Sequence, residues 1–430
     1  MAHHTVKPAY SKLVDRINRF PQGAPSSDLL FQILELLFNE KEAELVSLLP
    51  IKPFTAEKAA SIWQKSLPQT RKILQELSEK AILLDVEHRG KPLYVLPPPM
   101  AGFFEFSMMR TRRDIDQKLL SELFFAYINV EDDFIKQLFM EGETQLGRTF
   151  VHEPALSEQN TLHVFDFERA SEVIRTASCM GISLCYCRHK MTHMEQACNA
   201  PLDICMTFNS AARSLVKHGF ARQVDPVEGM ELLHKAYEHN LVQFGENVRE
   251  RINFICNCCG CCCEAMLAQK RLSAFAPIHT TGFFPLPDSE NCTGCGKCVD
   301  ICPVEAMALV SRNDPARPKA KKARVDINMC LGCGLCVRAC PEGNISLQER
   351  ENRLIPPLNG VHRAVAMAVE RGRLQDLIFD NRILKSHRAM AAVLKVILNL
   401  PPAKQILASG QLKSKYLETI LRRIENVYPF

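Results

Sequence analysis

Two cysteine runs of identical spacing constrain this chain more than any other feature of its sequence. The first run, C-x2-C-x2-C-x3-C, consists of Cys292, Cys295, Cys298 and Cys302, and Pro303 follows it. The second run repeats that spacing 38 residues later and consists of Cys330, Cys333, Cys336 and Cys340, followed by Pro341. Cysteines three residues apart can reach three corners of one metal cluster, and the glycines inside both runs let the backbone wrap closely. The spacing therefore predicts soft-metal ligation, and it is not the spacing of zinc fingers.

The two runs and their flanks, NCTGCGKCVDICPVEAMAL and MCLGCGLCVRACPEGNISL, resemble the bacterial two-cluster ferredoxins. The resemblance implies an α+β module at residues 288–347 with two similar halves and two [4Fe–4S] clusters. In this family the fourth cysteine of each run ligates the other cluster. The resemblance thus implies one ligand set of Cys292, Cys295, Cys298 and Cys340, and a second set of Cys330, Cys333, Cys336 and Cys302.

The chain has 19 cysteines, which exceeds what two such clusters need, and all lie between Cys179 and Cys340. Ten of the remaining eleven form two groups, which are Cys185, Cys187, Cys198 and Cys205, and then Cys256, Cys258, Cys259, Cys261, Cys262 and Cys263. Six cysteines within eight residues are not expected to form an apolar core. We predict that these ten bind metal as one or two additional iron–sulfur clusters, with zinc or a redox-active thiol site as alternatives. Cys179 is interpreted as a plain buried thiol.

Two further patterns bear on this cysteine-rich region. Adjacent cysteines in extended backbone point to opposite sides, so they are expected to serve different irons or different clusters. Two helices expected at about residues 208–218 and 225–239 could return the chain and bring both cysteine groups together. Arg188 follows Cys187 directly and is the candidate for raising the potential of a nearby cluster.

The compartment follows from the cysteines and from the lack of targeting signals. Disulfide frameworks belong mostly to small secreted domains, whereas this chain has 430 residues. The N-terminal segment lacks the apolar stretch of a secretory signal, and no run of 18 or more uncharged apolar residues exists. We therefore expect a cytoplasmic protein whose thiols are metal ligands.

The expected fold class is multidomain and mainly α, with a ferredoxin-like α+β module. The predicted segments are a winged-helix-like domain at 1–100, a helical connector at 101–178, the cysteine-rich region at 179–287, the dicluster module at 288–347 and a helical C-terminal region at 348–430. Helical patterns near 28–37, 55–63 and 69–80, then two short strands around a turn at 89–91, resemble a winged-helix domain. Phenylalanines between 103 and 139 are predicted to be core.

The expected function is iron–sulfur electron transfer, or electron delivery as a subunit of an anaerobic oxidoreductase. The layout is similar to large 4Fe–4S binding proteins of anaerobes. One alternative is a reductase with a catalytic iron–sulfur centre at Cys185–Cys263. Another is a redox-sensing winged-helix regulator, although residues 1–150 carry 19 Lys or Arg against 20 Asp or Glu, which is unfavourable for phosphate binding. Catalytic residues are not evident, so whether the protein is an enzyme stays open.

The expected partners are redox proteins. The basic loop at 311–325 is either a solvated loop or a docking patch for an acidic redox partner. Ala389–Leu400 and the basic Lys413–Arg423 could lie on a membrane surface, or could pack on the body of the protein as most amphipathic helices do.

Overall fold

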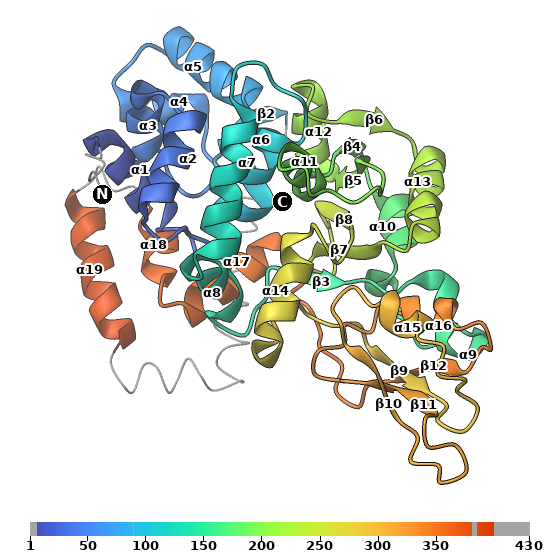
Figure 1. The fold of residues 1–430 in the computed structure, drawn as a ribbon. Coiled ribbons are helices and arrows are strands. Elements are labelled where there is room, and N and C mark those ends of the chain that lie inside the picture. The colour runs from blue at the N-terminus through green and yellow to red at the C-terminus, as the bar shows by residue number, and fades with distance from the viewer. Residues whose placement is uncertain (1–6, 89, 381–384, 400–430) are drawn as a thin grey trace. The chain divides into compact units, whose positions relative to one another are not determined.

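The structure is a computed structural model that describes residues 7–88, 90–380 and 385–399. The chain divides into two compact units. The first comprises Met1–Thr144, Ser210–Arg222 and Leu358–Phe430, and the second comprises Gln145–Asn209 and Gln223–Pro357. The cysteine-rich region and the ferredoxin-like segment thus belong to one unit, and each unit is described by itself below (Figure 1).

The first unit begins with five short helices, several of which have capping residues at their N-termini. They are α1 (Pro8–Ile17), α2 (Asp28–Leu37), α3 (Glu40–Ser47), α4 (Ala56–Trp63) and α5 (Leu67–Glu79). Ser27 and Thr55 cap α2 and α4 with their side-chain oxygens, as their residue types predict. Helix α3, which Asn39 and Glu42 start with a capping box, was not predicted.

A hairpin follows these helices. Strands β1 (Leu84–His88) and β2 (Lys91–Val95) pair antiparallel, with Leu84 opposite Val95. Residue 89 of the expected turn lies outside the described residues. The order of helices and hairpin agrees with the predicted pattern, while kinship with winged-helix domains stays a prediction.

The rest of the first unit is helical and rich in aromatic side chains. It contains α6 (Phe104–Met108), α7 (Gln117–Phe125), α8 (Asp133–Met140), α12 (Asn209–Lys217), α17 (Gly360–Glu370), α18 (Leu374–Ile378), α19 (Lys385–Asn399) and π-helical turns at Pro99–Phe103 and Ala126–Val130. The predicted core role of the phenylalanines is confirmed for Phe103, Phe104, Phe106, Phe124, Phe134 and Phe139, which are buried. No helix in the described part is long and apolar enough to cross a membrane. The segment Lys413–Arg423 lies outside the described residues.

The second unit is built on a six-stranded sheet that the sequence analysis did not predict. Its strand order is β3-β7-β8-β5-β4-β6, and the strands are β3 (Gly147–Thr149), β4 (Met180–Leu184), β5 (Asp203–Phe208), β6 (Arg222–Val224), β7 (Val242–Glu246) and β8 (Phe254–Cys258). Helices α10 (Ala170–Thr176) and α13 (Pro226–Glu238) share a hydrophobic core with the central strands, which includes Ile174, Leu233 and Ile255. Short apolar strands interrupted by cysteines resemble buried helix segments in sequence, so periodicity alone did not reveal them.

The remaining elements of the second unit hold the cysteines. Helix α11 (Tyr186–His193) follows Cys185, and α14 (Glu264–Leu272) follows Cys263, while α9 (Glu158–Thr161) and 3-10 turns at Glu153–Ala155, Asp166–Glu168 and Ser273–Phe275 are short. The ferredoxin-like segment, orange in Figure 1, consists of β9 (Phe283–Pro287), α15 (Lys297–Asp300), β10 (Met307–Ser311), β11 (Lys321–Val325), α16 (Leu335–Ala339) and β12 (Ile345–Glu349). Strand β9 pairs with β12 and β10 pairs with β11, both antiparallel, so the two halves have matching elements.

Candidate metal centres

The two ferredoxin-like halves wrap their cysteine runs with the same backbone conformation. Gly294 and Gly332 both have φ of +71°, and Gly296 and Gly334, with φ of +83° and +90°, start α15 and α16. These conformations favour glycine, and at Gly332 a Cβ would also lie 2.1 Å from the carbonyl oxygen of Phe283. The glycines of the sequence motif are therefore needed for the turn that aims the cysteines.

The structure gathers the first predicted ligand set around one pocket. The pocket is lined by Cys292, Cys295, Cys298 and Cys340, together with neighbours from β10, β11 and β12. Cys340 comes from the second run, as the crossed ligation of two-cluster ferredoxins requires. Burial and the nearby Cys292 raise the pKa of the Cys298 thiol. The positive charge of a bound cluster core would act in the opposite direction, because it favours the thiolate form of its ligand.

The second predicted set is also brought together, and it is more deeply buried. Burial raises the pKa of Cys330 to about 11 and that of Cys333 to about 12, and Cys302 of the first run adds to both shifts. Backbone N–H groups reach the crossing cysteines at the same offset in both halves. Ala306 N donates to Cys302 Sγ at 3.2 Å, and Asn344 N donates to Cys340 Sγ at 3.3 Å. Such bonds stabilise a thiolate in each half.

Six of the ten upstream cysteines form a closed ring in the same unit. Their thiols interact in consecutive pairs, in the order Cys185, Cys187, Cys263, Cys258, Cys256, Cys205 and back to Cys185. We call this set the six-cysteine ring. The Sγ atoms of Cys258 and Cys263 lie 3.2 Å apart. Antiparallel pairing of β5 with β8 brings Cys205 beside Cys256, so the sheet assembles the ring from distant parts of the sequence.

The thiols of the ring influence one another strongly. Hydrogen bonds from their neighbours lower the pKa of Cys185, Cys256 and Cys263, the last to about 5. The same bonds, with burial, raise the pKa of Cys187, Cys205 and Cys258. Neighbouring thiols of the ring therefore shift one another's pKa in opposite directions. Metal binding would release the remaining protons, because thiolates are the ligands.

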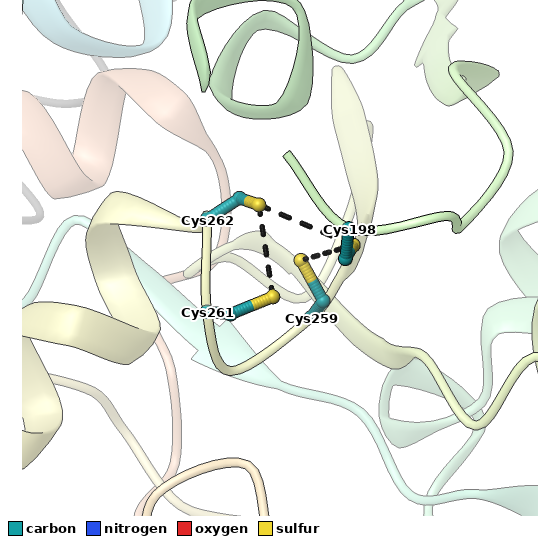
Figure 2. Close-up of side chains that lie close together, drawn as sticks. All are labelled: Cys198, Cys259, Cys261 and Cys262. Atoms are coloured by element: carbon teal, nitrogen blue, oxygen red, sulfur yellow. Dashed lines mark hydrogen bonds between the residues drawn. The ribbon is translucent and has the colours of Figure 1, made fainter. Parts of the chain in front are cut away.

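The other four upstream cysteines form a separate set beside the ring. Their Sγ atoms all lie within 4.8 Å of one another, and the set consists of Cys198, Cys259, Cys261 and Cys262. We call it the four-cysteine group. Figure 2 shows three of these side chains on the loop between β8 and α14, with Cys198 opposite them on the chain that follows α11. A hydrogen bond with Cys262 lowers the pKa of Cys259 to about 4, and the charge of Arg188 contributes.

Arg188 lies between the two sets and is almost fully buried, with 1% of its surface exposed. Its guanidinium donates to the carbonyl oxygen of Asn257 through both terminal nitrogens, at 3.2 and 3.1 Å. Although burial alone would lower the pKa of Arg188, the charges of Cys185, Cys205 and Cys259 raise it. One buried cation thus faces thiolates of both sets, which is consistent with the predicted tuning role of Arg188.

A buried ion pair ties the two helices that follow the ring cysteines. Lys190 on α11 and Glu264 at the start of α14 form a salt bridge, and their side chains are 0% and 2% exposed. Because α11 follows Cys185 and contains Cys187 while α14 follows Cys263, this pair joins the two helices that carry neighbouring members of the ring. Neither residue was singled out in the sequence, since a lone lysine and a lone glutamate 74 residues apart carry no local signal.

The ring and the second ferredoxin-like set pack against each other. One hydrophobic cluster contains Cys258 and Cys263 of the ring together with Cys330, and Cys302 and Cys333 pack on it. A Cβ at Gly260 would lie 2.4 Å from the carbonyl oxygen of Pro303, so the CNCCGCCC loop touches the backbone next to Cys302. The backbone of the ferredoxin-like segment and that of the cysteine-rich loop are therefore in direct contact.

The structure brings the two upstream cysteine groups together, as expected. Neighbouring cysteines belong to different sets at Cys258–Cys259 and at Cys262–Cys263. Cys261 and Cys262, however, belong to the same set. Cys179 lies in neither set and is half-buried. Sequence reasoning missed Asn257, which is fully buried between two ring cysteines and accepts from Gln243 at 3.0 Å.

Comparisons with known proteins agree with the ferredoxin-like module and extend no further. Residues 291–351 match the model of the 4Fe–4S dicluster domain family. Over 28 residues, 6% of this chain, the sequence is 54% identical to Ferredoxin-2 of Desulfomicrobium norvegicum (strain DSM 1741 / NCIMB 8310). The chain spans 48% of the length of that ferredoxin. No solved structure matches the chain. The chain therefore carries a ferredoxin-like 4Fe–4S dicluster domain at residues 291–351, and such a domain supports iron–sulfur electron transfer in general.

Proposed function

We propose that this protein transfers electrons through the two [4Fe–4S] clusters of its dicluster domain to or from a further iron–sulfur centre in the six-cysteine ring. The observation that carries the proposal is that ring cysteines Cys258 and Cys263 share one buried hydrophobic cluster with Cys330 of the second ligand set. Redox centres whose ligands share one hydrophobic cluster form a short, water-excluded path.

The order of the path follows from exposure. Cys295 in the first ligand set is exposed, whereas Cys330 and Cys336 in the second set are buried. The first cluster is thus the entry or exit for an external partner, and the second connects it with the ring. Anaerobic reduction of the full chain by reduced methyl viologen, followed by reoxidation, should bleach and restore the cluster absorption without iron loss. Iron release on reduction, or no bleaching, would contradict an electron-transfer role.

Contact between the CNCCGCCC loop and the dicluster domain gives one prediction. In Gly260→Ala the added methyl would meet the Pro303 carbonyl oxygen at 2.4 Å and its Cα at 2.8 Å, so backbone has to move. We expect destabilisation by about 1–3 kcal/mol and slower reduction of the ring centre in stopped-flow absorption. Gly343→Ala is the control, because a Cβ there meets nothing within 4 Å and its φ of +66° adds only local strain. Equal reduction rates in both variants would argue against this contact as part of the path.

The basic hairpin beside the first cluster is the proposed docking surface for an acidic redox partner. Ala323 N donates to Cys292 Sγ at 3.4 Å, so β11 lies against a ligand of this cluster. The exposed cations of the hairpin are Arg317, Lys319, Lys321 and Arg324. Arg317 is paired with Asp314 at 3.0 Å, which leaves the other three as the main charge on this surface.

Charge reversal tests this docking surface. In Lys319→Glu/Lys321→Glu/Arg324→Glu we expect oxidation of the reduced protein by the anionic acceptor Fe(III)–EDTA to slow by about tenfold at low salt, because attraction becomes repulsion. Oxidation by hexaamminecobalt(III), a cation, should not slow. Lys235→Glu on α13 is the control for net charge. A triple variant that reacts with the anion as fast as wild type would remove the docking proposal.

A reductase with its catalytic centre in the ring is the second candidate function. The observation that favours it is the ring's six thiols, two more than one cubane takes. A spare ligand or a larger cluster could present a reactive position. The regulator alternative has less support, since Arg71, Lys72 and Lys80 on α5 or at its end form ion pairs with Glu57, Glu76 and Glu42. These pairs occupy cations that would have to contact DNA phosphates.

A further inference from the structure

The ten upstream cysteines form two sets, and among the described residues only the four-cysteine group has all its sulfur atoms within 4.8 Å of one another. Within this group the Sγ atoms of Cys198 and Cys259 lie 3.6 Å apart, as do those of Cys261 and Cys262. Cys262 Sγ lies 4.0 Å from Cys198 Sγ. Disulfide bonds have sulfur–sulfur lengths of about 2 Å, so none of these contacts is a disulfide.

Metal geometry decides what such a set can hold. Four thiolates around a single tetrahedral ion with metal–sulfur bonds of about 2.3 Å lie about 3.8 Å from one another. Four thiolates on the corners of a [4Fe–4S] cubane are separated by the cluster itself and lie about 6 Å apart. The distances of 3.6, 3.6 and 4.0 Å agree with the single ion. A cubane would require every sulfur pair, all within 4.8 Å, to open by more than 1 Å on this estimate.

The same chain supplies an internal comparison. All eight ferredoxin-like cysteines lie in the described part, and no three of their sulfur atoms form a mutually close set of this kind. The side chains of the first ligand set instead line a pocket. The four-cysteine group is therefore tighter than the two sets whose sequence spacing indicates cubanes.

The surroundings of the group also suit a tetrathiolate ion. A divalent ion with four thiolates carries a net charge of about −2, and the buried guanidinium of Arg188 places a positive charge near Cys259. The backbone N–H of Cys262 also bonds Cys259, which orients that ligand. As Figure 2 shows, Cys198 closes the group from a separate segment, so an ion here would fasten the chain after α11 to the loop after β8.

We propose that the four-cysteine group of Cys198, Cys259, Cys261 and Cys262 binds one tetrahedral divalent ion, Zn²⁺ or Fe²⁺, and no inorganic sulfide. Both ions accept a tetrathiolate site of this geometry. The site fixes the loop between β8 and α14. Ring cysteines Cys256 and Cys258 lie on β8 before this loop, and ring cysteine Cys263 lies directly before α14 at its end. It is distinct from the iron–sulfur centre proposed for the ring, and it stands whether or not that centre transfers electrons.

The test compares metals and acid-labile sulfide in the anaerobically purified full chain and in Cys261→Ser/Cys262→Ser. We expect the variant to lose about one metal ion per chain and no sulfide, and the element that falls distinguishes zinc from iron. Loss of about four irons with four sulfides would overturn the proposal, because it would indicate a cubane. Loss of no metal would overturn it as well, and would indicate a thiol site.

Two controls keep the result interpretable. Cys179→Ser, a half-buried cysteine outside both sets, should change neither quantity. Cys261 is exposed, so Cys261→Ser alone is a mild variant for the case in which the double variant does not fold. From this variant a chelator should remove one ion faster than from wild type, without sulfide, and simultaneous release of sulfide would overturn the proposal. Sulfide of the dicluster domain, measured in the same samples, reports separately on the proposed electron-transfer function.

Discussion

Replacing Cys258 and Cys263 with serine is expected to remove about four irons and four sulfides per chain and to leave about eight of each in the dicluster domain. The two residues are adjacent in the six-cysteine ring, with Sγ atoms 3.2 Å apart. Together they account for a third of its thiols. Serine preserves the side-chain size but is a poor ligand for iron–sulfur clusters, which need soft thiolates.

The number of irons lost also distinguishes the forms that the ring centre can take. A loss near four indicates one cubane that leaves two ring thiols without iron. A clearly larger loss indicates a cluster that uses all six thiols, such as two fused iron–sulfur units. Iron and sulfide contents equal to those of wild type would contradict a cluster in the ring, and Cys179→Ser serves as the matched control.

Replacing Glu264 with glutamine is expected to destabilise the second unit by about 3–5 kcal/mol. The substitution keeps the shape of the side chain but leaves the charge of Lys190, which is 0% exposed, without its carboxylate partner. A buried charge that loses its counterion retains the full penalty of removal from water. Because α11 and α14 carry ring cysteines at their starts, we also expect the ring centre to be lost more readily.

The measurement is urea unfolding followed by circular dichroism and by cluster absorption, with the midpoints compared because two units need not unfold in one step. The double variant Glu264→Gln/Lys190→Met should recover much of the lost stability, since neither charge of the buried pair remains. Asp314→Asn breaks an exposed pair with Arg317 in the same unit and should change stability by less than about 1 kcal/mol. If Glu264→Gln and Asp314→Asn lower the unfolding midpoint equally, the buried pair of Lys190 and Glu264 does not stabilise the second unit as we expect.

The dicluster domain could be predicted because its information is local. Each run places four cysteines, two glycines and a proline within a dozen residues, and the turn they form depends on little else. Helix starts at Ser27 and Thr55 were equally readable, since a cap acts within one turn. The structure reproduces the same turn in both halves, with φ of +71° at Gly294 and at Gly332.

The excess of cysteines made it possible to predict that the upstream cysteines bind metal, but not that they divide into two separate sets. Their division depends on strand pairing between β5 and β8, which lie about 50 residues apart and have no hairpin signal between them. The alternation of an extended strand sends Cys256 and Cys258 to the ring, but the loop after β8 turns Cys259, Cys261 and Cys262 to Cys198. Loop geometry of this kind is not encoded in residue spacing. The buried pair of Lys190 and Glu264 depends on the same long-range assembly.

An anaerobic reductive titration of the full chain, with the electrons accepted per chain counted against cluster absorption and electron paramagnetic resonance, tests the central claim most directly. We predict about two electrons for the dicluster domain and at least one more for the ring centre, with the additional electron absent in Cys258→Ser/Cys263→Ser. Magnetic interaction between the reduced second cluster and the ring centre should broaden the wild-type spectrum and disappear in the variant. Two electrons and the same spectrum in both proteins would contradict an electron path from the dicluster domain to the ring.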